Sequence, residues 1–353
     1  MHLGTRVLYM NQDLCNRYIV DYDAIAEYIK RNNIRRILVQ APDGLKPLYL
    51  CIHRVLSGRA ELYYSSSPTY GACDLALNEA RRLRAEVILH IGHTEYPFLH
   101  IKPEIPVLYI PAYYRWTPSK KLMDDLADHL KSLNAQNIGL VASIQHTHSL
   151  EQLAEELEKR GFNPIIGSKP YRVADRGQII GCDYTSAIAI EDFVDVFLVL
   201  AGGKFHAIGL ALSMSEKKVL GLDPYTGKIW DAQGEARRIL AKRYYIVTSL
   251  ANKGFSSVGV VIGLKPGQYR PRIVHIIEEY AKKKSICVYK IVSEELTEDR
   301  LIAIDNALAL DIYVVTSCPR LALDDLEGFY KPVLTPAEYV MLFTKDYTYR
   351  YPW

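Results

Sequence analysis

The sequence predicts an α/β protein of three related domains, each a small, mostly parallel sheet flanked by helices. Three observations lead to this prediction. A weak repeat is visible in each third of the chain, each repeat opens with an apolar run that ends in a Gly- or Pro-containing turn or a polar turn, and a helical pattern follows each run. The length of 353 residues suggests two or three domains. We predict domains at 1–115, 116–235 and 236–353.

Each predicted domain contributes three strands. Their short, continuous apolar runs are typical of strands buried on both faces of a parallel sheet. A helix after each strand indicates βαβ units with right-handed crossovers. In the clearest helix, Ser149 and Gln152 are expected to form a capping box. The opening strands with their turns lie at 37–44, 138–146 and 258–268, the second strands at 61–64, 163–166 and 286–289, and the closing strands at 87–92, 196–201 and 312–317.

The composition is that of a soluble globular protein, with 49% hydrophobic and 24% charged residues. A net charge of +3 is too small to indicate nucleic-acid binding by itself. We expect no membrane span, because acidic residues interrupt the most apolar stretch, 187–201, and no secretory segment at the N-terminus. A cytoplasmic location is therefore expected, where cysteines more often bind metals or act in catalysis than form disulfides.

Three cysteines lie in similar turn-like settings, one in each predicted domain. They are Cys73 in Gly-Ala-Cys-Asp, Cys182 in Gly-Cys-Asp and Cys318 in Ser-Cys-Pro. Asp74 and Asp183 are expected to cap helices, whose positive ends favour the thiolate form. Because open α/β sheets gather ligands at the carboxyl ends of their strands, the three domains are expected to surround a central cluster held by these thiols. Three buried, inert cysteines are the alternative.

The number of sulfur ligands leaves two kinds of metal site open. Three thiolates with a free fourth position fit a four-iron cluster, and three thiolates with a histidine fit zinc. The other cysteines, Cys15, Cys51 and Cys287, lie in apolar or helical surroundings and are expected to be structural. The aromatic C-terminal residues 347–353 are expected to pack on the body of the protein or on a second subunit.

Polar residues and glycines at the strand ends are further candidates for ligand binding. Glycines allow backbone N–H groups to approach a ligand closely, and a histidine can meet a carboxylate. The expected cofactor-binding residues are Gln40, Gln145, Gly202, Gly203, His206 and Gln268.

Taken together, these elements resemble the family of archaeal enzymes for the first step of diphthamide biosynthesis, the 2-(3-amino-3-carboxypropyl)histidine synthases. The resemblance rests on Gly71-Ala-Cys-Asp, Gly181-Cys-Asp, Gly202-Gly-Lys-Phe-His, Gly263-Leu-Lys-Pro-Gly-Gln and Ser317-Cys-Pro-Arg, and it spans about 37–343. It implies a [4Fe-4S] cluster on Cys73, Cys182 and Cys318, with S-adenosylmethionine on the fourth iron. It also implies a homodimer and an external one-electron donor.

The resemblance further implies the reaction. Reductive cleavage of the S–Cγ bond of S-adenosylmethionine would deliver a 3-amino-3-carboxypropyl group, with radical character, to C2 of a histidine in translation elongation factor 2. The alternatives are a three-domain iron–sulfur enzyme of the quinolinate synthase type, in which the free iron is a Lewis acid, a non-catalytic α/β binding module and, as a poorer option, a zinc enzyme.

Overall fold

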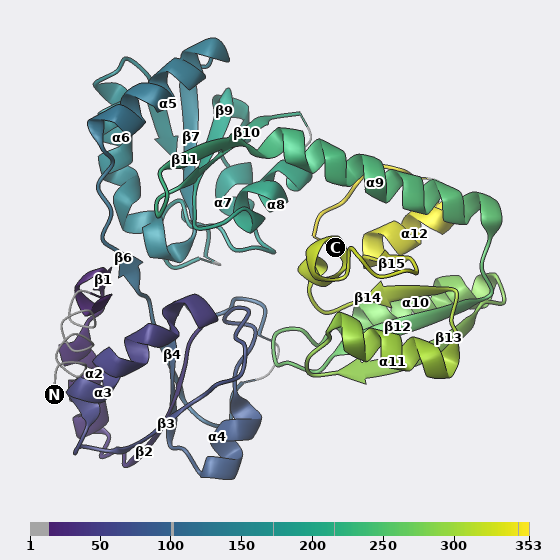
Figure 1. Cartoon of the computed structure of the whole chain (residues 1–353), viewed down its shortest axis with the longest axis horizontal. Coiled ribbons are helices and arrows are strands. Elements are labelled where there is room, and N and C mark those ends of the chain that lie inside the picture. Colours follow the sequence, from purple (N-terminus) through teal and green to yellow (C-terminus); the bar gives the residue numbers. More distant parts are fainter. Residues whose placement is uncertain (1–13, 100–101, 172, 215, 345, 353) are drawn as a thin grey trace, which may run out of the picture. The chain divides into compact units, whose positions relative to one another are not determined.

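The computed structural model describes residues 14–99, 102–171, 173–214, 216–344 and 346–352 (Figure 1). Residues 1–13, on which the predicted lack of a secretory segment mainly depends, lie outside the described residues. Trp353 of the aromatic tail also lies outside them. The chain forms two compact units. The described parts of Met1–Ile179, Thr185–Gly203 and Gly221–Ile229 make unit 1, and those of Ile180–Tyr184, Lys204–Leu220 and Trp230–Trp353 make unit 2.

The predicted α/β class is confirmed, and each predicted strand is found. Every predicted domain range holds one sheet of four or five strands, and the division into three domains stays a prediction. The two units follow a different division, because unit 2 takes the Cys182 segment together with the C-terminal third of the chain.

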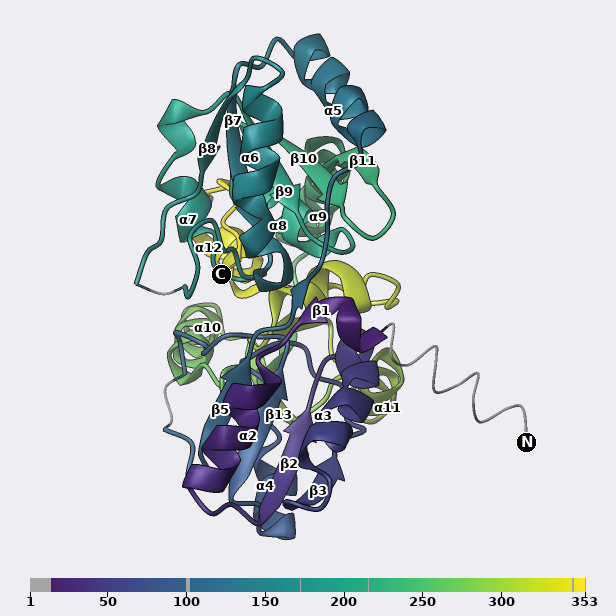
Figure 2. The ribbon, with the colours of Figure 1, turned by 90° about the vertical axis from the view of Figure 1, so that its left-hand side faces the viewer.

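The first sheet has the order β3-β2-β4-β5, and its neighbouring strands are all parallel. Alternate residues of β2 point to opposite faces, as the pleat of a strand requires. Ile37 and Val39 pack in the cluster with α2 and α3, whereas Leu38 packs in the cluster with α4 (Figure 2). The elements are α2 (Tyr22–Arg31), β2 (Arg36–Gln40), a 3-10 turn (Asp43–Leu48), α3 (Tyr49–Leu56), β3 (Glu61–Tyr64), α4 (Leu77–Leu83), β4 (Val87–Ile91) and β5 (Val107–Ile110).

The second sheet has the order β11-β10-β9-β7-β8, with β7 parallel to both β8 and β9. The predicted capping box is wrong. A 3-10 turn runs directly into the helix, so Ser149 itself has helical backbone angles and its hydroxyl makes no capping bond. The elements are α5 (Lys120–Ser132), β7 (Asn137–Ala142), 3-10 turns (Ile144–Ser149 and Glu191–Phe193), α6 (Leu150–Glu158), β8 (Asn163–Ile166), α7 (Thr185–Ile188), β9 (Val196–Leu200), α8 (Phe205–Ser213), β10 (Lys218–Asp223) and β11 (Lys228–Asp231).

The third sheet has the order β13-β12-β14-β15 and is parallel throughout. Val260 packs in a cluster with α10 and α12, and Val261 packs on the opposite face in a cluster with α11. The elements are α9 (Ala232–Lys253), β12 (Ser257–Gly263), α10 (Pro271–Lys283), β13 (Cys287–Ser293), α11 (Glu298–Leu308), β14 (Ile312–Val315), a π turn (Leu321–Asp325), β15 (Val333–Leu334) and α12 (Pro336–Thr344). A small antiparallel pair joins β1 (Tyr18–Ile19) to β6 (Tyr113–Tyr114).

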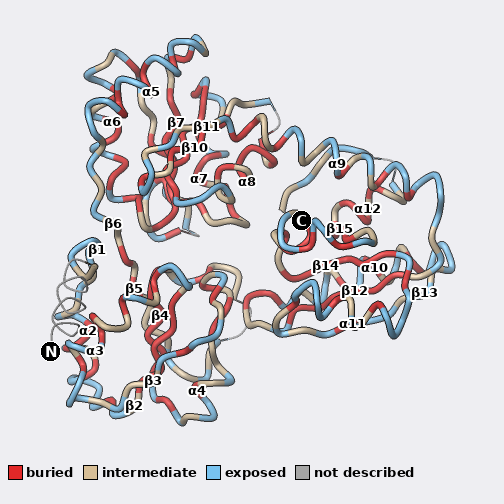
Figure 3. The backbone as a smooth tube through the Cα atoms, viewed as in Figure 1, coloured by how far each residue is buried: buried red, intermediate tan, exposed pale blue. Residues whose placement is uncertain are grey.

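The central strands are buried along their whole length, as their apolar runs predict. Every residue of β4, β9 and β14 is buried, and the tube of Figure 3 is red along these strands. No helix among the described residues combines the length and the apolar composition needed to cross a bilayer.

Cys15 and Cys51, which were expected to be structural, form a disulfide, although the expected cytoplasmic location favours metal binding or catalysis over disulfides for the cysteines of this chain. Their Cα atoms lie 5.9 Å apart, a separation that a disulfide spans without strain. Cys51 is buried in the core of the first sheet, and Cys15 packs against the same core. The bridge therefore ties the beginning of the described chain to α3.

Candidate functional site

Two of the three predicted metal-binding cysteines, Cys182 and Cys318, belong to unit 2. Cys182 lies in a tight turn that is closed by two backbone hydrogen bonds between Ile180 and Asp183, of 3.0 and 2.9 Å. Cys318 follows β14, and the N–H of Leu321 donates to its carbonyl at 3.1 Å. Both cysteines are half-buried and neither is in a disulfide.

The two thiols are close enough to influence each other electrostatically. Burial raises the pKa of Cys318 to about 11, and the charge of Cys182 adds to this shift, while a hydrogen bond from the Arg320 backbone opposes it. A like charge disfavours ionisation of a neighbouring group only at short range. The pair is therefore a local feature of unit 2, and the Cys318 thiol stays protonated at neutral pH when no cation is bound.

Aromatic side chains pack against the Cys182 turn and α8. A Cβ at Gly181 would overlap with the ring of Phe205, so glycine is the residue that lets the Cys182 turn lie against that ring. Gly209 on α8 likewise leaves room for Tyr184, whose ring lies 6.0 Å from that of Tyr351. The hydroxyl of Tyr351 donates to the carbonyl of Gly181 at 3.0 Å. We refer to Cys182 and Cys318 as the thiol pair.

Arg320 supplies a cation beside this aromatic group. Its guanidinium lies 5.6 Å from the centre of the Phe205 ring and makes ion pairs with Asp324 at 3.1 Å and Asp325 at 3.4 Å. Burial, followed by the charge of Arg320, lowers the pKa of His206 to about 4. The imidazole of His206 is therefore neutral at physiological pH.

Cys73, the third predicted ligand, belongs to unit 1, and Gln40 holds its loop. The side-chain amide of Gln40 donates to the carbonyl of Asp74 at 2.6 Å and to the hydroxyl of Thr69 at 3.3 Å, and it accepts from the N–H of Ala76 at 3.0 Å. Gln40 is 2% exposed, and both ends of its amide are used by the loop. The side chain thus fixes the backbone around Cys73.

The predicted helix cap next to Cys73 is wrong, because α4 begins at Leu77 and has Ala76 at its N-cap position. α7 begins at Thr185, two residues after Asp183, and the capping role of Asp183 stays a prediction. The carboxylate of Asp74 instead accepts from the N–H of Tyr70 at 3.2 Å, which closes the Cys73 loop. Asp74 thus contributes to the shape of this loop.

Three of the other predicted cofactor-binding residues also lie in unit 1. The amide of Gln145 donates to the carbonyl of Gly92. Gly202 and Gly203 follow β9, and Gly203 has a φ of +71°, which favours glycine. A Cβ at Gly202 would approach the ring of Tyr225 to 2.7 Å, so this turn packs directly on an aromatic face.

The remaining two predicted residues lie in unit 2. His206 is in the first turn of α8, next to Phe205 and within the influence of Arg320. Gln268 is 6% exposed and closes a turn after β12 through a bond of 2.9 Å from its N–H to the carbonyl of Lys265. The structure thus brings His206 to the surroundings of the thiol pair and Gln40 to the Cys73 loop.

Sequence reasoning missed Phe205, Tyr184, Tyr351 and Arg320 as parts of the site. For each of these residues, the sequence contains a feature that could have indicated its place in the site. Phe205, Tyr184 and Arg320 adjoin or nearly adjoin predicted site residues, and the expected packing of the aromatic tail on the body of the protein holds for Tyr351.

Two histidines, the buried His90 and the half-buried His93, lie together in unit 1. The Nε2 of His90 and the Nδ1 of His93 lie 2.9 Å apart, and burial together with His93 lowers the pKa of His90. Burial, Glu95 and Cys73 together raise the pKa of Tyr109 to about 12. Within the described residues, no group of three or more His, Cys, Asp or Glu side chains is gathered in a metal-binding arrangement.

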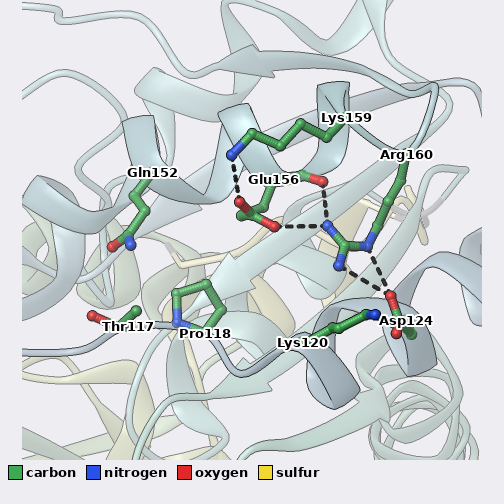
Figure 4. Close-up of a pocket in the computed structure, with 8 residues that line it drawn as sticks. All are labelled: Thr117, Pro118, Lys120, Asp124, Gln152, Glu156, Lys159 and Arg160. Carbon is green, nitrogen blue, oxygen red and sulfur yellow. Dashed lines mark hydrogen bonds and ion pairs between the residues drawn. The ribbon is translucent and has the colours of Figure 1, made fainter.

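A surface pocket of about 600 Å³ lies elsewhere in unit 1, beside α5 and α6 (Figure 4). Arg160 pairs there with Asp124 at 3.0 Å and with Glu156 at 2.7 Å, and Lys159 pairs with Glu156 at 2.7 Å. None of the predicted site residues lines it. Its charges largely neutralise one another, which gives no indication of a charged ligand.

Comparison with known proteins gives a consistent result along the chain. Residues 41–352 match the family described as "Putative diphthamide synthesis protein". The 2-(3-amino-3-carboxypropyl)histidine synthase of Pyrococcus horikoshii is 31% identical over 90% of this chain and 88% of its own length. The protein of the same name from Methanocaldococcus jannaschii is 25% identical over 92% of this chain and 89% of its own length.

A solved structure is similar over nearly the same range. The crystal structure of Dph2 from Pyrococcus horikoshii with a 4Fe-4S cluster is 28% identical and superposes with a TM-score of 0.81. The match covers 94% of this chain and 93% of that one. The sequence match and the shared fold lead to one conclusion: this chain belongs to the diphthamide synthesis protein family.

Proposed function

We propose that this chain is a 2-(3-amino-3-carboxypropyl)histidine synthase, which transfers the 3-amino-3-carboxypropyl group of S-adenosylmethionine to a histidine of translation elongation factor 2. In this proposal Cys73, Cys182 and Cys318 hold a [4Fe-4S] cluster, the protein works in the cytoplasm as a homodimer, and an external donor supplies one electron. The archaeal relatives that bear this name and the 4Fe-4S cluster in the Pyrococcus horikoshii structure support it.

The observation that carries the proposal is the thiol pair of unit 2. Two unbridged cysteines, 136 residues apart in sequence (318 − 182), lie close enough for Cys182 to raise the pKa of Cys318. Burial favours the neutral thiol at Cys318, whereas a bound iron ion would take the cysteine as a thiolate, with loss of the thiol proton to solvent. The residues present thus fit the group, because two unbridged cysteines lie close together and a bound metal would offset the negative charge of their thiolates.

When bound, the cluster would supply the electron that cleaves the S–Cγ bond of the co-substrate. The protein's own residues orient the reactants and exclude water. Gln40 fixes the Cys73 loop, and we therefore propose a positioning role for Gln40 instead of direct contact with S-adenosylmethionine.

The other predicted residues are proposed to contact S-adenosylmethionine directly. His206, neutral at physiological pH, would take part through hydrogen bonds and would not repel the sulfonium as a cation does. The expected contacts are Gln145, Gly202, Gly203, His206 and Gln268.

The test combines cysteine variants with product analysis. Cys73→Ala, Cys182→Ala and Cys318→Ala are purified without oxygen, reconstituted with iron and sulfide, and compared with Cys287→Ala as the matched control, since Cys287 is exposed and unbridged. We expect each of the three variants to lose iron and the modification of elongation factor 2, and the control to keep both.

Chromatography of the small products separates the candidate reactions. Methylthioadenosine is expected, and 5′-deoxyadenosine as the main product would contradict the proposed bond cleavage. Iron binding without any turnover of S-adenosylmethionine would instead favour the Lewis-acid chemistry of the quinolinate synthase type. A protein that stays colourless and iron-free after reconstitution would favour a binding module.

A further inference from the structure

The C-terminal residues 346–352, which we call the C-terminal strap, are anchored to unit 2 at several points. The hydroxyl of Tyr244 on α9 donates to the carbonyl of Tyr347 at 2.8 Å. The hydroxyl of Tyr349 donates to the carboxylate of Glu338 on α12 at 3.0 Å. The strap is therefore a built part of unit 2, held by polar contacts that start from two different helices.

The Tyr349 anchor rests on a rigid base. Glu338 is 0% exposed and forms a buried ion pair with Arg243, whose Nε lies 2.7 Å from the carboxylate. The Tyr349 ring also lies 6.1 Å from that of Tyr244, edge to face. Burying a polar group is favourable only where its partners are fixed, and here both partners of the strap are packed in helices.

The end of the strap reaches the thiol pair. The hydroxyl of Tyr351 donates to the carbonyl of Gly181, the residue directly before Cys182, at 3.0 Å. Its ring lies 6.0 Å from the ring of Tyr184, and a Cβ at Gly209 would come within 3.2 Å of it. Tyr351 thus packs between the Cys182 turn and α8.

Both thiols lie near this tyrosine. The pKa of its hydroxyl is raised first by burial and then by Tyr184, and electrostatic interaction with Cys318 and Cys182 adds to the shift. One side chain of the strap therefore contacts the Cys182 turn at Gly181 and lies within electrostatic range of both members of the thiol pair. A side chain in this place restricts the approach of reagents from its side and holds the Cys182 turn through the Gly181 carbonyl.

We propose that Tyr351 is a positioning residue of the thiol pair: its hydroxyl fixes the Cys182 turn, and its ring restricts access to Cys182 and Cys318. The C-terminal strap is the element that holds Tyr351 in place. The proposal deepens the proposed function, because the same two thiols are the proposed cluster ligands. Its test uses cluster-free protein, so its failure would leave the proposed function untouched.

The test measures the alkylation of each cysteine by iodoacetamide in reduced, cluster-free protein. Peptide mass spectrometry follows Cys182 and Cys318 separately, and Cys287, exposed in the same unit, is the internal reference. The variants are Tyr351→Ala and Tyr351→Phe. The matched control is Tyr171→Ala, which changes a tyrosine that is 89% exposed.

We expect Tyr351→Ala to accelerate alkylation of both thiols by about tenfold, the factor that corresponds to about 1.4 kcal/mol of lost protection. Tyr351→Phe keeps the ring and loses one hydrogen bond, so the rate at Cys182 should rise by about fivefold and the rate at Cys318 should change less. Cys287 should react at the same rate in every variant, and Tyr171→Ala should behave as the wild type.

Unchanged rates at both thiols in Tyr351→Ala would overturn the proposal. An equal acceleration of Cys287 would also overturn it, because that result means general loosening of unit 2. If the alanine variant does not fold, the phenylalanine variant decides. A rate at Cys182 equal to that of the wild type then refutes the positioning role of the hydroxyl.

Discussion

The buried ion pair between Arg243 and Glu338 offers a sharp test of how unit 2 is held together. Arg243 on α9 is 5% exposed and Glu338 on α12 is 0% exposed. The guanidinium also donates to the carbonyls of Ala322 at 3.1 Å and Val333 at 2.6 Å. The carboxylate accepts from the N–H of Thr335 at 2.8 Å. The pair therefore links α9 to α12, to β15 and to the π turn.

We predict that Glu338→Ala lowers the free energy of unfolding by about 3–5 kcal/mol, the usual effect of leaving a buried charge without its partner. The Arg243→Met/Glu338→Leu double variant should lose less than the sum of the two single variants, because it leaves no uncompensated charge. Some loss should remain, since backbone groups that paired with these side chains lose their partners.

Urea denaturation of the cluster-free protein, followed by circular dichroism, measures these differences. Asp125→Ala is the matched control, because its ion pair with Lys121 lies on an exposed helix face, with side chains 57% and 84% exposed. That variant should lose less than about 1 kcal/mol. A loss below about 1 kcal/mol for Glu338→Ala as well would refute the view that this buried pair stabilises unit 2.

Three further predictions concern other parts of the chain. Gln40→Leu leaves buried polar groups of the Cys73 loop without partners, at a cost of about 1–3 kcal/mol, and should lower iron content after reconstitution; full iron content would contradict the positioning role. Reducing the disulfide between Cys15 and Cys51, which closes a loop of 36 residues, should lower the unfolding free energy by about 4 kcal/mol in urea titrations, and an unchanged midpoint in reductant would argue against the bridge. The pKa of Asp311 is lowered to about 2 by hydrogen bonds from backbone and hydroxyl groups, so its contribution is present above about pH 4 and is lost as the pH falls toward 2. Because this carboxylate is exposed, that contribution is about 1 kcal/mol, and Asp311→Asn should remove it at pH 7 but not at pH 2, as thermal melts at the two pH values would show.

The strands could be predicted because their signal is local. Each central strand is a short run of mostly apolar residues that includes β-branched Val or Ile, a composition typical of burial on both faces of a parallel sheet. The predicted runs at 37–40, 138–142 and 258–263 lie within β2 (Arg36–Gln40), β7 (Asn137–Ala142) and β12 (Ser257–Gly263). Helix ends were predicted less well, because the side chains expected to cap them bond elsewhere: the carboxylate of Asp74 accepts from the N–H of Tyr70, and the hydroxyl of Ser149 lies 3.3 Å from the Nε2 of His148.

The sequence alone determined the α/β class, the strands and the three cysteine-containing turns, because these depend on neighbouring residues and on hydrophobic periodicity. Only the tertiary structure decided that Cys15 meets Cys51, that Gln40 holds the Cys73 loop and that Tyr351 meets Gly181 from 170 residues away. Such pairs depend on how whole helices and strands pack, because packing brings together residues that are far apart in sequence. The type of each residue alone does not indicate which partner it will meet.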